Sequence, residues 1–218
     1  MPKKGLPRRL LLLLPGLLIA VFSLHFHGLH EFLNFKLKYV PRSPMEVVQG
    51  LVNAGARRPW IHDPHVLAYL SLPLFLVTAV LLYRIGRKHR PRASLAAGFL
   101  TLAGTIYLGG LFGMWTAFYG GLAQVGPENL TGAVATFSAL TAEQGPFLLT
   151  TSLAKLAFIG IALQMLVLWN TPEIPRYGVL LAIAGCTLFL VFWDLDNWML
   201  LGSAFLFVGF AALRPSDA

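Results

Sequence analysis

Six stretches of the sequence consist almost entirely of apolar residues, and the polar residues gather between them. These stretches cover about residues 10–30, 64–83, 93–118, 146–169, 177–193 and 198–213. A helix rises about 1.5 Å per residue, so runs of this length suit the ~30 Å hydrocarbon layer of a bilayer. The pattern predicts an all-α, polytopic membrane protein whose residues 1–218 form a single domain of six transmembrane helices.

The first and the last two stretches are the least regular. The first follows basic residues, but no small-residue cleavage motif comes after Ala20, so we expect a retained anchor rather than a cleaved signal peptide. The last two reach only about 24 to 26 Å as helices, so we expect them to cross steeply or where the bilayer is thin. They form a hairpin that closes at residues 194–197.

Composition and charge agree with a membrane protein. The chain is 56% hydrophobic and 12% charged, whereas soluble domains carry about 25% charged residues. A net charge of +8 would also suit a nucleic-acid-binding protein. However, eleven of the seventeen Lys and Arg residues flank the spans on one predicted side: Lys3, Lys4, Arg8, Arg9, Arg84, Arg87, Lys88, Arg90, Arg92, Arg176 and Arg214. Because such residues mark the cytoplasmic side, we expect an inner-membrane protein with both termini in the cytoplasm and no nucleic-acid partner.

Residues 31–63 and 119–145 are then the outward loops. The second loop contains no Lys or Arg, whereas five basic residues between positions 25 and 63 are an exception to the charge rule. Each loop is predicted to carry a short surface helix. One begins with proline at Pro44, and the other is marked by apolar residues at Val134, Phe137 and Leu140.

Two groups of histidines stand near the outward ends of the first two spans. If the first helix continues outward, His27, His30 and Glu31 share one face, and His62 and His65 open the second span at the same level. Imidazole and carboxylate ligands suit zinc, copper or non-haem iron. Haem fits less well, since its axial histidines should lie deep in facing helices. The alternative is that these are ordinary interfacial histidines without a metal.

Lys155 is the strongest polar feature inside a predicted span. It lies about 15 Å from the outward end of the fourth span, where an ammonium group costs about 2.5 to 3.5 kcal/mol or more. We expect it to face the bundle, with Thr151 and Ser152 one turn outward. The alternative is that its stem reaches the outward interface, where Asp194 or Asp196 could pair with it.

Glycines in the third span predict close helix packing. Gly109 and Gly113 have the GxxxG spacing that lets helix backbones approach. Nucleotide-binding, hydrolase and zinc-protease motifs are all missing from the sequence, and a single cysteine, Cys186, excludes a disulfide framework. Packing is therefore better indicated than catalysis.

These features favour an integral membrane subunit or accessory protein of a larger membrane complex, with a metal at its outward face as an added hypothesis. Two alternatives stay open. The histidine groups could belong to a metal-dependent membrane oxidoreductase or a metal-handling protein, and Lys155 could line the pathway of a small transporter. Whether the protein is an enzyme is not decided by the sequence.

The metal hypothesis predicts that purified protein carries a transition metal and that His27→Ala or His30→Ala removes it, because each imidazole supplies one ligand. Elemental analysis of protein purified without chelators measures this. His89→Ala, in the basic loop after the second span, is the matched control and should keep the metal.

Overall fold

The computed structural model describes residues 13, 43–55, 64–122, 124–142, 145–172, 174–192 and 196–213, and every regular element among them is helical. The α-helices are α2 (Pro44–Gly55), α3 (Pro64–Gly86), α4 (Pro91–Leu122), α5 (Leu130–Thr141), α6 (Pro146–Ala154), α7 (Leu156–Val167), α8 (Arg176–Val191) and α9 (Asp196–Ala211), and η2 (Pro127–Asn129) is a short 3₁₀ helix. The predicted all-α class is confirmed for this part of the chain.

Five of the six apolar stretches coincide with helices, while residues 10–30 lie almost wholly outside the described residues. α4 and the continuous segment Pro146–Val167, which contains α6 and α7, are long and apolar enough to cross a membrane. α8 and α9, with 16 residues each, are shorter. Six crossings therefore stay a prediction. The two short loop helices are confirmed as α2 and α5.

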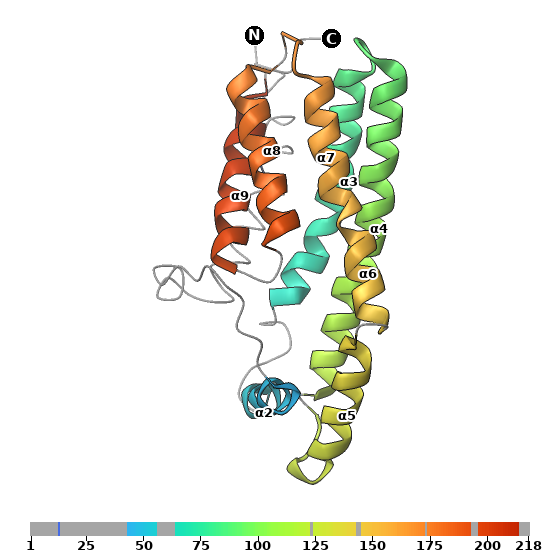
Figure 1. Cartoon of the computed structure of the whole chain (residues 1–218), viewed down its shortest axis with the longest axis vertical. Helices are drawn as coiled ribbons and strands as arrows, with labels where there is room; N and C mark the ends of the chain where they lie inside the picture. Colours follow the sequence, from blue (N-terminus) through green and yellow to red (C-terminus); the bar gives the residue numbers. More distant parts are fainter. Residues whose placement is uncertain are drawn as a thin grey trace, which may run out of the picture.

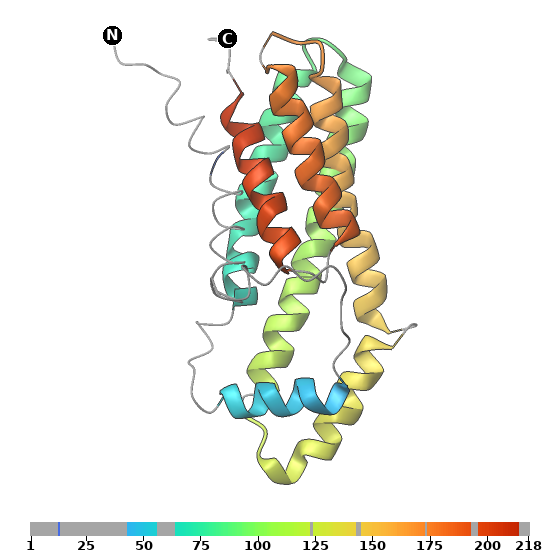
Figure 2. The same ribbon diagram turned by 60° about the vertical axis from the view of Figure 1, so that its left-hand side comes forward.

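The long helices lie side by side in an elongated bundle, and α2 lies across one end of it (Figures 1 and 2). α4 extends along most of the molecule, whereas the α8–α9 hairpin lies beside only part of that length. The most extensive helix pairs are α8 with α9, α4 with α7, and α3 with α4. The end that lacks α8 and α9 is built from α2, α5 and the last turns of α4, and we call it the cap.

Proline and a capping box start the helices. α2, α3, α4 and α6 each begin with proline, whose fixed φ suits the first helical position. At the start of α2, the Ser43 backbone N–H donates to a Glu46 carboxylate oxygen at 2.8 Å, and the Glu46 N–H donates back to the Ser43 hydroxyl at 3.3 Å. These reciprocal bonds satisfy N–H groups that a helix start leaves free.

The closest helix contact joins α4 to α7. A Cβ atom added at Gly104 would overlap the backbone of Leu156 and Ala157, and one added at Gly160 would overlap Thr101. By contrast, the predicted GxxxG pair meets only side chains of α3, with Leu72 3.2 Å from a Cβ at Gly109. The prediction of close glycine packing in this helix is confirmed, but it occurs at Gly104 and against α7.

α8 and α9 pack through two pairs of facing glycines. A Cβ atom added at Gly209 would lie 2.8 Å from the Gly178 carbonyl oxygen, and one added at Gly202 would lie 3.0 Å from that of Gly185. The glycines are seven residues apart on both helices. Since seven residues complete nearly two helical turns, the pair stays in contact along its length.

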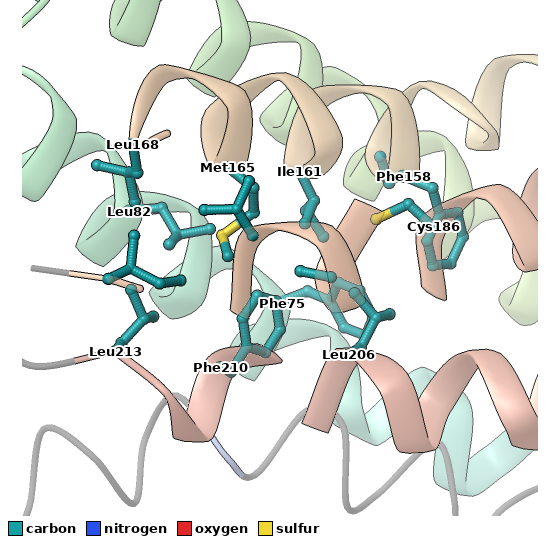
Figure 3. Packing of buried hydrophobic residues seen from close by; sticks show 14 of the residues in the cluster. Phe75, Leu82, Phe158, Ile161, Met165, Leu168, Cys186, Leu206, Phe210 and Leu213 are labelled. Carbon is teal, nitrogen blue, oxygen red and sulfur yellow. The ribbon is translucent and has the colours of Figure 1, made fainter. Parts of the chain in front are cut away.

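Aromatic side chains join α3 and α7 to the α8–α9 hairpin. The rings of Phe158 on α7 and Phe189 on α8 stack with centroids 4.5 Å apart, and Phe75 on α3 meets Phe158 edge-on at 6.1 Å. Figure 3 shows side chains from α3, α7, α8 and α9 pointing into this shared core. A separate cluster holds the cap, where the fully buried Val48 of α2 packs with Leu122, Ala133 and Phe137.

The α4–α7 contact predicts that Gly104→Ala destabilises the protein by about 1 to 3 kcal/mol, because the new methyl group must push two backbones apart. Thermal unfolding in detergent micelles measures the change. Gly110→Ala in the same helix is the control, since its Cβ would be 3.8 Å from its nearest neighbour, an ordinary contact. Equal melting temperatures for the two variants would contradict the interpretation.

Candidate functional site

Most charged residues of the described structure lie at one of its two ends. Apart from Lys155, every described Lys and Arg lies at the end where α3 meets α4 and α7 meets α8: Arg84, Arg87, Lys88, Arg90, Arg92 and Arg176. We call this the basic end. The described carboxylate residues are Glu46 and Glu128 in the cap and Asp196 at the start of α9. Between these two ends, the charged residues that the structure describes are Lys155 and Asp196, and most of the large exposed side chains are apolar.

The predicted metal ligands cannot be compared with one another in this structure. His27, His30, Glu31 and His62 lie outside the described residues. His65 lies in the first turn of α3, where only the backbone is described. Among the residues that are described, no three His, Cys, Asp or Glu side chains gather around one point. The metal site stays a prediction.

Lys155 occupies the junction between α6 and α7. Its N–H donates to the Thr151 carbonyl at 3.2 Å, and its own carbonyl accepts the N–H groups of Phe158 and Ile159, both at 3.1 Å. The helix therefore continues through the junction. Lys155 and Thr151 are half-buried, and Ser152 is exposed. Lys155 is therefore only partly buried by the packing of the bundle, and its role stays a prediction.

The end of α8 lies at the level of Lys155. α7 and α8 are antiparallel neighbours, and the stacked pair Phe158 and Phe189 sets their register. Lys155 precedes Phe158 by three residues and Phe192, the C-cap of α8, follows Phe189 by three. A helix C-terminus carries a partial negative charge, so the backbone itself makes this level favourable for an ammonium group.

A buried amide, Gln164, links three helices and was missed by the sequence interpretation. The Gln164 side-chain amide donates to the Ala79 carbonyl of α3 at 2.9 Å, and its oxygen lies 3.0 Å from the Thr101 hydroxyl of α4. The same hydroxyl is 3.1 Å from the Ala97 carbonyl. Gln164 and Thr101 are 2% and 0% exposed, so these polar atoms are satisfied inside the bundle.

The signal for Gln164 was an isolated amide in the otherwise apolar stretch 156–169. Helical periodicity alone places it on the same side as Ala157 and Gly160, but it does not tell which side faces protein. The close approach of α4 decides this. Gln164 is best understood as a structural bridge, since both of its polar atoms are used within the bundle.

The aromatic residues near the cap form a packed cluster. The rings of Trp115 and Phe147 are stacked with centroids 4.3 Å apart, and Phe118 and Phe137 stack at 5.9 Å. At the basic end, an open depression follows the α7–α8 turn, where the Arg176 guanidinium lies 5.7 Å from the centre of the Trp169 ring. Neither arrangement assembles a set of catalytic groups in the described structure.

In comparisons with known proteins, no family model, no curated protein and no solved structure matches this chain. Its function must therefore be argued from its own residues.

The bridge predicts that Gln164→Leu lowers stability by about 1 kcal/mol, because hydrogen bonds between membrane helices typically contribute about 0.6 kcal/mol and at most about 1.7. Unfolding by a denaturing detergent, followed by circular dichroism, measures the loss. Gln124→Leu, at an exposed turn position, is the control. If the hydrogen bonds of Gln164 do not stabilise the protein, Gln164→Leu and Gln124→Leu will be equally stable.

Proposed function

We propose that this chain is an integral membrane subunit or accessory protein of a larger membrane complex, crossing the inner membrane six times with both termini in the cytoplasm. The proposal is supported by the outer surface of the bundle. On α4, Leu95, Phe99, Leu102 and Ile106 follow one helical face and are 46% to 66% exposed. Soluble proteins rarely leave a continuous face of this kind uncovered, whereas lipid covers it without cost.

The separated charges support the orientation. The basic end matches the excess of Lys and Arg that marks cytoplasmic loops. Arg176 begins α8 and Arg84 lies in the last turn of α3, so the α3–α4 and α7–α8 connections turn at the same side of the proposed membrane. The cap, with Glu46 and Glu128, then faces outward.

The cap is the observation that carries the accessory role. The 32 residues of α4 measure about 48 Å, which exceeds a ~30 Å hydrocarbon layer by about 18 Å. If the basic end is at the headgroups, the last turns of α4 project beyond the bilayer with α2 and α5 folded on them. Val48 anchors α2 there with no exposed surface. A folded platform outside the membrane is suited to contact with a partner chain.

The two alternative functions depend on the predicted metal ligands and on Lys155. The metal-dependent oxidoreductase or metal-handling function needs His27, His30, Glu31, His62 and His65 to converge on zinc, copper or iron. A transporter with Lys155 in its pathway needs a polar route between helices, and the contact of Gly104 with Ala157 leaves no room for one between α4 and α7.

The proposal predicts opposite accessibility for Ser43 and Arg87. In a Cys186→Ala background, Ser43→Cys should react with a membrane-impermeant maleimide in intact cells, and Arg87→Cys should react only after permeabilisation. Both positions are exposed in the structure, so burial does not explain a difference. The reverse labelling pattern would overturn the orientation.

The same prediction extends to assembly. Protein extracted from its native membrane in lipid nanodiscs should migrate with a second membrane protein in a fixed ratio. A monomer that carries one equivalent of metal would instead favour the oxidoreductase or metal-handling function. A monomer without metal would contradict the accessory role.

A further inference from the structure

Lys155 stands in the middle of an exposed helical stripe on α6 and α7. The stripe consists of Leu148, Ser152, Lys155, Ile159, Leu163 and Leu166, whose spacing of three or four residues keeps them on one face. Its apolar members are 36% to 50% exposed. We call it the Lys155 stripe.

The ammonium group has no partner among the side chains that the structure describes. Glu46 is bonded to Ser43 at the start of α2, and Glu128 lies within η2, where its carboxylate accepts from the Asn129 amide. An ammonium group in a hydrocarbon layer costs about 2.5 to 3.5 kcal/mol or more, and the partial negative charge at the end of α8 offsets only part of that cost. An arriving anion would remove that cost.

The depth of Lys155 in the hydrocarbon layer determines which kind of anion can reach its ammonium group. Twelve residues separate Lys155 from the end of α7, which places it about 18 Å from the basic end and about 12 Å from the far side of a ~30 Å layer. A lysine stem reaches only about 6 Å. Phosphates at the basic end are beyond that distance, and phosphates on the outward side come within it only where the membrane is as thin as the α8–α9 hairpin is short. A side chain carried into the layer by another helix meets no such limit.

We propose that the Lys155 stripe is the docking face for a transmembrane helix of a partner protein that carries an aspartate or glutamate at the level of Lys155. The inference rests on the proposed function and names the chemistry of the partner. The apolar members of the stripe supply the packing surface, and the charge pair selects the partner and its axial register. A second copy of this chain is a poorer occupant, because the same face would bring a second ammonium group.

A designed transmembrane peptide tests the proposal. The full chain is reconstituted in phosphatidylcholine vesicles, and binding of a fluorescent Leu/Ala peptide with one central Glu is compared with a matched peptide carrying Gln. We expect the Glu peptide to bind at least about tenfold more tightly. The preference should disappear in Lys155→Met, which keeps the apolar stem, and persist in Lys155→Arg. Lys88→Met at the basic end is the matched control and should bind as the wild type does.

Reversing the charge of residue 155 provides a second test of the proposal. Lys155→Glu should prefer a peptide with a central Lys over the Glu peptide, which a change in general stability would not produce. Equal binding of the Glu and Gln peptides to the wild type would overturn the proposal. So would a preference that survives in Lys155→Met.

Two further outcomes identify other occupants and would also overturn the proposal. Loss of peptide binding when phosphatidylglycerol is added would assign the site to lipid phosphate. Binding that appears only after Asp194→Asn and Asp196→Asn would assign it to the chain's own acidic turn. Because the peptide assay uses purified protein in vesicles, its failure leaves the labelling and assembly results on the proposed function unaffected.

Discussion

The contact between α4 and α7 is the constraint on which the rest of the bundle depends. Gly104 lies against the backbone at Ala157, and Gly160 lies against Thr101, so the two helices touch without intervening side chains. This approach brings the Thr101 hydroxyl within 3.0 Å of the Gln164 oxygen. In the membrane location that we propose, packing and hydrogen bonds provide the stabilisation that the hydrophobic effect cannot, because lipid is as apolar as the side chains.

From this contact the remaining helices acquire their places. Gln164 also bonds to α3 through the Ala79 carbonyl, which fixes α3 beside α7. Phe158 on α7 then stacks on Phe189 and holds the α8–α9 hairpin, whose own facing glycines make it a rigid unit. Because α8 ends one turn beyond Phe189, the bundle becomes thinner at the level of Lys155. The uneven lengths of the helices thus leave Lys155 partly exposed.

The basic end and the cap differ in how their helices are connected. At the basic end the helices are joined by short turns that carry cationic side chains, and the backbone hydrogen bonds of the α3–α4 turn run within the turn itself. At the cap, α2 and α5 are folded on α4 through a separate apolar cluster around Val48. Trp115 of α4 packs against both this cluster and the neighbouring one around Phe147, so the cap is joined to the bundle through α4.

Local patterns were sufficient to predict the helices. Apolar stretches of 16 or more residues are too long for typical strands and favour helices, and the prolines at positions 44, 64, 91 and 146 mark where four of the helices begin. The sequence by itself therefore determined the all-α class and the boundaries of five stretches to within a few residues. It also determined where the basic residues lie relative to the apolar stretches, because those positions are read directly from the chain and do not depend on folding. Convergence of the two histidine groups depends on how the first span packs, which no local pattern decides.

Which faces meet was decided only by the tertiary structure. Gly104 and Gly109 are equally small, and only the crossing of α4 with α7 makes the first one indispensable. Gln164 and Lys155 are both isolated polar residues in apolar stretches, yet one bridges three helices and the other lies half-exposed at a helix junction. The physical reason is that helical periodicity gives relative angles around one axis, while the direction that faces protein depends on neighbours far away in the sequence.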